Sequence, residues 1–417
     1  MTSQLEGSLA VARTVASCRP QVICAYPITP QTHIVEALSR LVASGELSPC
    51  EFVNVESEFA AMSVAIGASA TGSRAYTATA SQGLLYMAEA LFNASGLGLP
   101  IVMTVANRAI GAPINIWNDH SDAMALRDCG WVQLYATSNQ EAADMHVQAF
   151  RLAERCSLPV MVCMDGFVLT HAFEPLALPE QGHVDQYLPA FRPRQVLDPA
   201  APVTIGALVG PEAYTEVRYL AHAKQTEALD EIPALAAEFA ERFGRPSGGL
   251  LECYRCEDAE TVIVALGSVF GTVQELVDER RAGGARVGAL AIKSFRPFPA
   301  GELREALSGA RAAIVLERAF SVGVGGIVSG DVHAALAGLH VDTATVIAGL
   351  GGRAITRRSL HAMLDRHEDG GLHPVHFLDL DRGVVERELA RQRSADRPGP
   401  HAENILRELG IVAAGPV

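Results

Sequence analysis

The sequence predicts an α/β protein, with a doubly wound parallel sheet in its first domain and a smaller α/β domain after it. Short apolar runs alternate with helical patterns from residue 7 to about 170, and the same alternation resumes at residue 261. A proline-rich stretch without periodicity separates the two parts. At 417 residues, 49% of them apolar and 19% charged, the chain is long enough for two or three domains with full cores.

The first domain, residues 1–170, is expected to alternate strands and helices. Its apolar runs predict strands at 21–26, 51–55, 74–80, 100–105, 131–136 and 159–165, and its helical patterns predict helices at 7–17, 33–44, from 58 onward, 84–95 and 140–155. Short apolar strands separated by helices are typical of a parallel, doubly wound sheet. Ligands bind such sheets outside the carboxyl ends of the strands, and four residues stand just beyond such ends: Tyr26, Glu58, Ser81 and Arg108.

Residues 171–250 are expected to connect the domains. They are aperiodic to about 211, then form a charged amphipathic helix at 212–243 that Pro233 interrupts, and end in a glycine-rich hinge at 244–249. The second domain spans 251–360, with strands at 261–266, 286–292, 312–316 and 344–347 and helices at 272–282, 301–307 and 328–336. Residues 361–417 have little apolar content and are predicted to form a surface arm or a partner-binding tail.

The composition excludes several classes of partner. A net charge of −14 argues against nucleic acid, because phosphate contacts need clustered Lys and Arg. The N-terminus lacks the basic start and apolar core of a leader, and no apolar run approaches the ~20 residues of a membrane span. We therefore expect a cytoplasmic protein without a membrane partner.

The eight cysteines favour free thiols over disulfides, because they are scattered and mostly stand inside apolar runs. Cys253-Tyr254-Arg255-Cys256 is a lone CxxC, and a metal or cluster site would need a second pair. We interpret Cys253 and Cys256 as two thiols at the mouth of the second domain, and we expect no metal on this chain.

Glu58 is the residue around which the site is predicted. It follows a predicted strand and starts a helix of small and apolar residues with almost no other charge nearby. A carboxylate in such a place needs a hydrogen-donating or positive partner, which the helix N-terminus supplies only in part. Either the protein or a ligand must supply the rest, and we favour a ligand.

Two further motifs allow a functional and a structural interpretation. In Tyr26-Pro27-Ile28-Thr29-Pro30 the prolines fix the backbone and leave the Thr29 hydroxyl facing outward. Composition alone favours a structural interpretation, a strand exit with Thr32 as a helix N-cap. Arg108 follows a buried strand among apolar neighbours and suits a carboxylate ligand, or else it forms a structural ion pair with Asp119 or Asp122. The long loop 111–128 is of the kind that is usually functional. A glycine turn at 323–326 resembles a phosphate-binding turn but does not fit G-x-G-x-x-G.

Several motifs in a fixed order resemble the alpha subunit of pyruvate:ferredoxin oxidoreductase and its 2-oxoacid relatives. They are Ala25-Tyr26-Pro27-Ile28-Thr29-Pro30, Val55-Glu56-Ser57-Glu58, Thr79-Ala80-Ser81-Gln82-Gly83-Leu84, Asn107-Arg108-Ala109 and Trp117-Asn118-Asp119-His120. The second domain agrees through Gly267-Ser268, Phe295-Arg296-Pro297-Phe298, Val315-Leu316-Glu317-Arg318 and Gly349-Leu350-Gly351-Gly352-Arg353. The resemblance covers roughly residues 7–360, and it implies a transketolase-C-terminal-like second domain.

The resemblance implies a thiamine-diphosphate enzyme in which this chain supplies the pyrimidine-binding domain. Glu58 would hydrogen-bond the aminopyrimidine ring and promote its imino tautomer. Arg108 and Thr29 would hold the carboxylate and carbonyl ends of a 2-oxoacid. The resemblance also places residues near the cofactor (Ser81, Gln82 and Ile116) and in the substrate pocket (Tyr26, Asn115 and Trp117).

The resemblance also implies partner subunits. The chain has no Gly-Asp-Gly followed by Asn, the usual diphosphate and magnesium site, and no cluster cysteines. Mg²⁺ is then expected on a beta subunit and the iron–sulfur clusters on a ferredoxin-like subunit, with a gamma subunit completing a dimer of hetero-oligomers. The implied reaction is CoA-dependent oxidation of a 2-oxoacid to acyl-CoA, CO2 and reduced acceptor.

Departures from the family pattern leave the substrate open. The run Val315 to Gly326 and the charged tail differ from what the family shows, so pyruvate, a branched-chain acid and an aromatic one such as phenylglyoxylate all stay open. The acceptor is ferredoxin or, through another subunit, NAD. The alternatives in function are a non-catalytic scaffold subunit and a transketolase-type enzyme without electron transfer.

Overall fold

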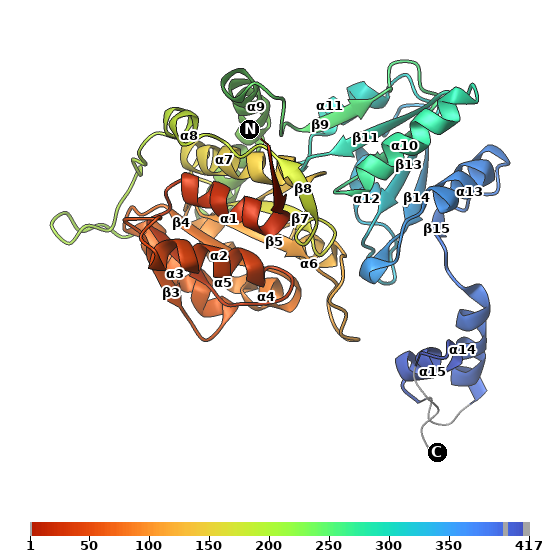
Figure 1. Cartoon of the computed structure of the whole chain (residues 1–417), viewed down its shortest axis with the longest axis horizontal. Coiled ribbons are helices and arrows are strands. Elements are labelled where there is room, and N and C mark those ends of the chain that lie inside the picture. The colour runs from red at the N-terminus through yellow and green to blue at the C-terminus, as the bar shows by residue number, and fades with distance from the viewer. Residues whose placement is uncertain (1, 395–398, 412–417) are drawn as a thin grey trace.

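The computed structural model describes residues 2–394 and 399–411, which form two α/β units and a C-terminal helical pair (Figure 1). The first unit is built on a seven-stranded sheet in the order β12-β6-β7-β5-β4-β2-β3. All its neighbouring strands are parallel except β12. Its strands are β2 (Val22–Ala25), β3 (Glu51–Asn54), β4 (Ala75–Thr79), β5 (Val102–Asn107), β6 (Val132–Tyr135), β7 (Val160–Asp165) and β12 (Ser294–Arg296).

Helices cover both faces of this sheet, as the doubly wound prediction requires. One face packs against α1 (Gly7–Ser17), α2 (Thr32–Ala43), α7 (Asn139–Cys156), α8 (Gln181–Tyr187) and α9 (Tyr214–Phe243). The opposite face packs against α3 (Glu58–Ala70), α4 (Ser81–Tyr86), α5 (Ala88–Gly96) and α6 (Ser121–Ala125). The predicted fold class is therefore confirmed.

The second unit contains a six-stranded sheet in the order β15-β14-β13-β10-β11-β9. Only β9 runs antiparallel to its neighbour among these strands. The strands are β9 (Leu251–Tyr254), β10 (Thr261–Ala265), β11 (Val287–Ile292), β13 (Ala312–Glu317), β14 (Asp342–Ile347) and β15 (Val375–Phe377). The helices are α10 (Val269–Ala282), α11 (Ala300–Leu307), α12 (Val328–Ala335), the short η1 (Leu350–Gly352) and α13 (Arg357–Glu368).

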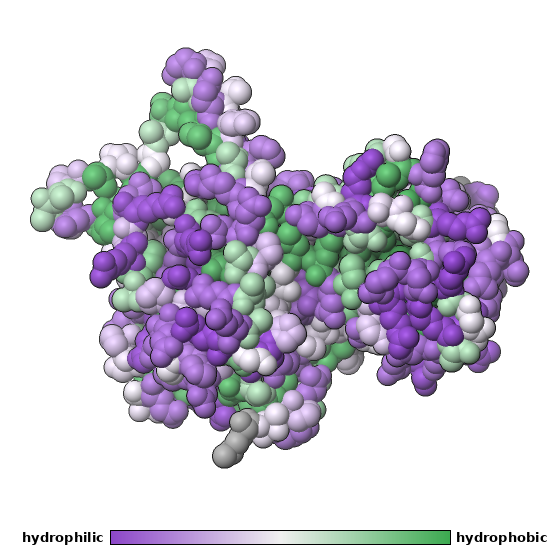
Figure 2. Space-filling model, turned by 90° about the horizontal axis from the view of Figure 1, so that it is seen from above, coloured by the Kyte–Doolittle hydropathy of each residue, from purple (hydrophilic) through white to green (hydrophobic). Residues whose placement is uncertain are grey.

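The two units share one core. Strand β12, which follows β11 of the second unit, pairs with β6 at the edge of the first sheet. Apolar side chains of both units also lie in one buried cluster, including Trp131 and Met161 from the first and Leu290 and Val315 from the second. The mutual position of the units is therefore fixed by buried apolar contact rather than by a flexible hinge. Figure 2 shows the two lobes from above, each with a mostly hydrophilic surface.

Some predicted elements differ from the structure. Strand β1 (Ser3–Glu6) pairs antiparallel with β8 (Phe173–Leu176), but neither has the apolar alternation that predicts a strand. The predicted helix 84–95 begins earlier, at Ser81, and is broken at Met87. The β3 strand, predicted to be buried, lies at the sheet edge and is partly exposed.

Helix α9 is continuous through Pro233, so the predicted interruption is wrong. Pro233 is exposed, while Ile232 and Leu235 beside it are buried in the core that α9 shares with α7. Their burial holds the helix together despite the missing hydrogen bond. Helix α9 thus packs as part of the first unit, within the segment predicted to be a connector.

The predicted boundary at residue 360 falls inside α13. This helix buries Leu360, Met363 and Leu364 in the core of the second unit, and β15 pairs with β14. The remaining helices, α14 (Arg382–Ser394) and α15 (His401–Glu408), project away from both units (Figure 1). No helix within 2–394 and 399–411 combines the length and apolar character that a bilayer crossing needs.

Candidate active site

Glu58 is the first residue of α3, at the edge of the first sheet where the parallel strands end, which we call the carboxyl edge. The preceding Ser57 caps the helix by accepting a hydrogen bond of 3.2 Å from Ala60 N. Glu58 is only 8% exposed, yet no hydrogen bond or ion pair reaches its carboxylate from any residue that the structure describes. A buried carboxylate in this state is suited to a ligand that donates a hydrogen bond.

Gly83 gives the Glu58 carboxylate its space. A Cβ added at residue 83 would lie 2.6 Å from both Glu58 Oε1 and Thr79 Oγ1. The turn that brings Gly83 there begins at Ser81, whose φ of 50° lies in the left-handed region that side chains rarely adopt. Gly83 was not predicted to be a site residue. Its position in the Ser81-Gln82-Gly83 motif, just after a predicted strand, could have indicated it.

We expect Gly83→Ala to impair both activity and stability. The added methyl group would displace the Glu58 carboxylate, because Thr79 on the other side belongs to a fully buried strand. The expected result is a loss of kcat of roughly 10²-fold, as misplacement of a positioned group by about 1 Å can cause. Steady-state kinetics of the assembled complex measure this loss. Gly67→Ala, in α3 with open space around its Cβ position, is the matched control and should leave kcat unchanged.

Asp122 joins the two strand ends that carry the site. Its buried carboxylate accepts hydrogen bonds from the backbone N–H groups of Ser81 (2.9 Å), Arg108 (3.0 Å) and Ala123 (2.8 Å) and from Asn107 Nδ2 (2.9 Å). Burial raises the pKa of Asp122, and these hydrogen bonds partly offset that rise. Asp122 therefore holds the start of α4 beside Arg108.

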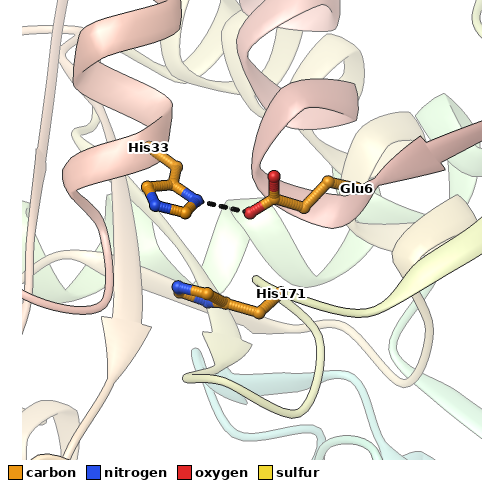
Figure 3. A group of neighbouring side chains, drawn as sticks. All are labelled: Glu6, His33 and His171. Carbon is orange, nitrogen blue, oxygen red and sulfur yellow. Dashed lines mark hydrogen bonds and ion pairs between the residues drawn. The ribbon is translucent and has the colours of Figure 1, made fainter.

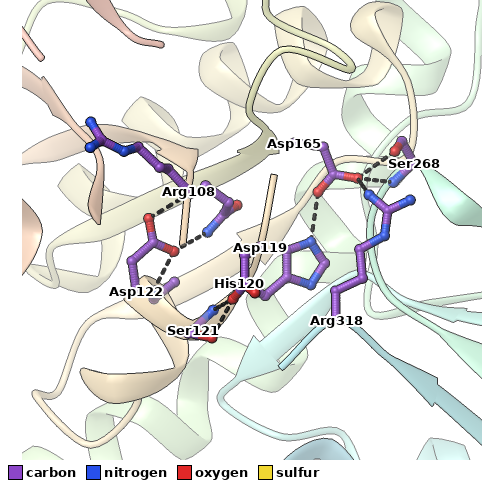
Figure 4. Close-up of polar contacts among 10 residues, drawn as sticks. Arg108, Asp119, His120, Ser121, Asp122, Asp165, Ser268 and Arg318 are labelled. Atoms are coloured by element: carbon purple, nitrogen blue, oxygen red, sulfur yellow. Dashed lines mark hydrogen bonds and ion pairs between the residues drawn. The ribbon is translucent and has the colours of Figure 1, made fainter. Parts of the chain in front are cut away.

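The Arg108 guanidinium points away from Asp122 (Figure 4). Its Nε donates to the Asn115 carbonyl at 3.1 Å and Nη1 donates to the Thr29 carbonyl at 2.9 Å. No ion pair to Asp119 or Asp122 occurs among the described residues, so that structural alternative is wrong. Burial lowers the pKa of Arg108, and Asp122 partly offsets this. The two carbonyls orient the side chain, and Nη2, which has no hydrogen-bond partner in the part of the chain that the structure describes, can bind an anionic ligand.

Three other predicted site residues, Tyr26, Thr29 and Ser81, differ in how deeply they are buried. Thr29 and Tyr26 are exposed, and Gln31 (not Thr32) immediately precedes α2, where its side chain donates to the Tyr26 carbonyl. Ser81 is fully buried, and its hydroxyl donates to the Ala109 carbonyl and to Gln82. Ser81 thus uses its hydroxyl inside the chain, which fits a positioning residue better than a ligand contact.

The loop after β5 presents its side chains toward the second unit and toward solvent. Ile116 is 38% exposed and Trp117 is 51% exposed, with the Trp117 ring 4.7 Å from that of Phe167. Asn115 Oδ1 accepts from Trp117 N at 2.8 Å, and its Nδ2 donates to the Gly351 carbonyl at 3.1 Å.

Glycines 351 and 352 of the second unit allow this loop to come close. A Cβ at Gly351 would lie 2.5 Å from Asn115 Nδ2, and one at Gly352 would lie 2.4 Å from Trp117 Cβ. Gly351 N also donates to Asp119 at 3.0 Å. The glycine motif at 349–352 therefore serves the contact between the units.

The glycine turn at 323–326 differs from the phosphate-binding turn that its sequence resembles. The backbone N–H groups of Ile327 (2.8 Å), Val328 (2.8 Å) and Ser329 (3.3 Å) at the start of α12 all donate to the buried Glu317 carboxylate. Burial raises the pKa of Glu317, and these bonds partly offset the rise. The protein's own acid thus occupies the donors that a phosphate would need.

A buried ionic network joins the units behind the loop (Figure 4). Asp165, at the end of β7, lies 2.6 Å from His120 Nε2 and 3.0 Å from Arg318 Nη1, and accepts from the backbone N–H of Ser268 at 2.9 Å. Burial alone would raise the pKa of Asp165, but His120, Arg318 and the hydrogen bonds outweigh it and hold the pKa well below its usual value. This network was not predicted from the sequence, although Asp165 is the last residue of a predicted strand.

We expect Asp165→Asn to destabilise the chain at neutral pH by about 3–5 kcal/mol, the usual effect of breaking a buried pair. A carboxylate whose pKa is lowered on folding stabilises the protein above its unfolded pKa of about 4, and that contribution is lost as pH falls. The difference between wild type and variant should therefore shrink below about pH 4. Denaturant unfolding of wild type and variant at neutral pH and below about pH 4 measures this difference in stability. Asp128→Asn, at an exposed aspartate, is the control. A difference that stays constant with pH would contradict the assignment.

Two family models match most of the chain. Residues 13–237 match the thiamine-diphosphate-binding domain of pyruvate flavodoxin/ferredoxin oxidoreductase, and residues 259–360 match core domain II of pyruvate:ferredoxin oxidoreductase. The chain is 54% identical to the pyruvate synthase subunit PorA of Methanosarcina barkeri, over 76% of this chain and 80% of the relative. It is 44% identical to PorA of Methanothermobacter thermautotrophicus, over 88% and 95% of the two chains.

Two further matches are to oxidoreductases named for other 2-oxoacids. The ketoisovalerate oxidoreductase subunit VorA of Pyrococcus horikoshii is 41% identical, over 87% of this chain and 92% of the relative. The 2-oxoglutarate:ferredoxin oxidoreductase of Magnetococcus marinus, solved with 2-oxoglutarate, coenzyme A and succinyl-CoA, superposes with a TM-score of 0.70 at 20% identity. The match covers 88% of this chain and 65% of that longer chain, and it shows a shared fold.

Proposed function

Since the chain belongs to the pyruvate flavodoxin/ferredoxin oxidoreductase family, we propose that it is the alpha subunit of a 2-oxoacid:ferredoxin oxidoreductase. The reaction is the CoA-acylating oxidative decarboxylation of a 2-oxoacid to acyl-CoA and CO2. The observation that carries this proposal is the buried Glu58 carboxylate, which has no hydrogen-bond or ion-pair partner among the described residues. Arg108 supports it, because two backbone carbonyls hold its guanidinium and its Nη2 has no partner among the same residues.

The chemistry of the residues at the carboxyl edge suits the pyrimidine half of thiamine diphosphate. When bound, this cofactor would supply a nucleophilic carbon for the 2-oxoacid and an acceptor for the electrons released on decarboxylation. Glu58 would accept a hydrogen bond from the protonated pyrimidine ring, in the space that Gly83 leaves open. Gln82 and Ile116, which are partly exposed at the same edge, would lie against the cofactor.

Arg108 and Thr29 would bind the substrate. The guanidinium is held by two backbone carbonyls, so it can pair with the substrate carboxylate through Nη2 without first being ordered. The exposed Thr29 hydroxyl would donate to the carbonyl oxygen, and Tyr26, Asn115 and Trp117 would line the pocket. A single arginine contact holds the carboxylate without making it too stable to leave as CO2.

We propose that partner subunits complete the site. Large apolar side chains surround the carboxyl edge with high exposure, namely Phe59 (38%), Tyr86 (61%), Ile114 (82%) and Trp117 (51%). Exposed apolar groups of this size are typical of an interface. A beta subunit with the diphosphate and Mg²⁺ site would dock here, and ferredoxin-like and gamma subunits would supply the iron–sulfur clusters and the rest of a hetero-oligomer dimer. A complex that uses CoA and ferredoxin is expected in the cytoplasm.

Pyruvate is the substrate that the similarity favours. Identity is 54% and 44% to two subunits named for pyruvate and 41% to one named for ketoisovalerate. Phenylglyoxylate stays the aromatic alternative, and NAD stays the alternative acceptor. The test is to purify the complex and measure CoA-dependent dye reduction with pyruvate, ketoisovalerate and phenylglyoxylate. Dye reduction that does not require CoA would overturn the proposal. So would a complex that reduces the dye with none of the three acids.

A further inference from the structure

Two histidines and a glutamate from segments far apart in the sequence meet on the first unit (Figure 3). Glu6 ends β1, His33 lies in the first turn of α2, and His171 lies in the turn after β7. One ligand atom from each lies within 4.8 Å of the other two, which is the only such group of three or more among the described residues. His33 Nδ1 is 2.6 Å from Glu6 Oε1, and the two imidazole centroids are 4.6 Å apart.

We propose that Glu6, His33 and His171 bind a divalent first-row transition-metal ion such as Zn²⁺. Two imidazoles and one carboxylate are a ligand set that suits Zn²⁺ and its neighbours, and this set leaves a further position open to water. Mg²⁺ and Ca²⁺ prefer oxygen ligands and fit this set poorly. Sequence spacing did not indicate the site, because its ligands come together only in the folded chain.

The surroundings hold the ligands in place. His171 Nδ1 is 2.7 Å from the hydroxyl of the fully buried Thr170, which fixes the ring and leaves Nε2 for the metal, as the outer hydrogen bond of a metal-binding histidine does. Thr170 is itself fixed, because its carbonyl accepts from the backbone N–H and the hydroxyl of Ser8. Glu6 is fixed by the pairing of β1 with β8.

Access from solvent also suits a metal. Glu6 and His33 line a cavity of about 220 Å³ together with Glu36 and Arg40. An ion can therefore reach the site from solvent.

A metal here would clamp three segments that lead to the active site. The Phe167 ring lies 4.7 Å from that of His171 and 4.7 Å from that of Trp117. Helix α2 begins directly after the segment that carries Thr29. The site would therefore stabilise the ring contacts behind Trp117 and the start of α2 without touching the reacting groups.

The test is metal binding by the full chain after treatment with a chelator, in a Cys253→Ser/Cys256→Ser background. This background is needed because the exposed Cys253 and its neighbour Cys256 form a pair of free thiols that can also bind zinc. Calorimetric titration with Zn²⁺ should give one equivalent bound, and thermal unfolding should shift to higher temperature with the ion. With Co²⁺, the absorption spectrum should show nitrogen and oxygen ligands.

The variants locate the ion. His33→Ala and His171→Ala should each weaken Zn²⁺ binding by more than the roughly 10–100-fold that loss of a ligand's hydrogen-bond partner costs. His222→Ala, which removes an exposed histidine on α9, should leave binding unchanged. A chain that binds no Zn²⁺, or that binds it equally well in the His33→Ala/His171→Ala double variant, would overturn the site and leave a simple His33–Glu6 ion pair.

Discussion

Replacing Glu58 by glutamine in the assembled complex is expected to reduce kcat for 2-oxoacid oxidation by roughly 10²–10⁴-fold, the usual contribution of a positioned acid–base group. Glutamine fills the same space beside Gly83 but is not charged and cannot stabilise a protonated ring nitrogen. The fold should be unaffected, because no described residue depends on the Glu58 carboxylate for a hydrogen bond. The rate of steady-state dye reduction should therefore fall, while the midpoint of thermal unfolding should not change.

The matched control is Glu56→Gln, an exposed acid two residues earlier in the same segment. Its kcat should equal that of wild type. If Glu58→Gln turned over at a near-normal rate in a correctly assembled complex, the chain would be a scaffold subunit that keeps the family fold without its catalysis.

Arg108→Lys is expected to lower kcat/KM for the 2-oxoacid by roughly 10²-fold, mainly through KM. Lysine keeps the positive charge but cannot donate to the Asn115 and Thr29 carbonyls while presenting another N–H to a carboxylate. The substitution should weaken binding of the 2-oxoacid more than binding of thiamine diphosphate, because we propose that Glu58, and not Arg108, binds the cofactor. Kinetics at saturating and limiting 2-oxoacid separate the two.

Arg127→Lys, in the same loop but paired with the exposed Asp128, serves as the control. Its kcat/KM should not change. An Arg108→Lys enzyme with normal KM and a reduced melting temperature would instead assign Arg108 a structural role, as a brace between the Thr29 and Asn115 segments.

The helices and strands could be predicted from the sequence because their signals are local. These signals are the spacing of apolar residues and the residues that begin and end helices. The helix at 7–17 has the predicted bounds, and Glu58 stands at a helix N-terminus as expected. Glu58 and Arg108 could be singled out because a charged residue after an apolar strand conflicts with its neighbours unless something satisfies it.

What could not be predicted depends on contacts between distant segments. The sequence indicated Asp122 only as a possible ion-pair partner of Arg108. Only the fold shows that its carboxylate accepts from the backbone N–H groups of Ser81 and Arg108 and so holds them together. The glycine turn at 323–326 has the composition of an anion site, but Glu317 from the preceding strand fills it. The β1–β8 pair lacks periodicity and forms because α1 packs under it, with Leu5, Ala10 and Leu176 in a small core of their own.

The most direct test is the structure of the assembled complex with thiamine diphosphate bound. We expect a Glu58 carboxylate oxygen within a hydrogen-bond distance of about 2.6–3.2 Å of a pyrimidine ring nitrogen. We also expect the diphosphate to be held by a partner chain. A Glu58 side chain turned away from the ring, or paired with a basic residue of its own chain, would contradict the assignment of this chain as the pyrimidine-binding catalytic subunit.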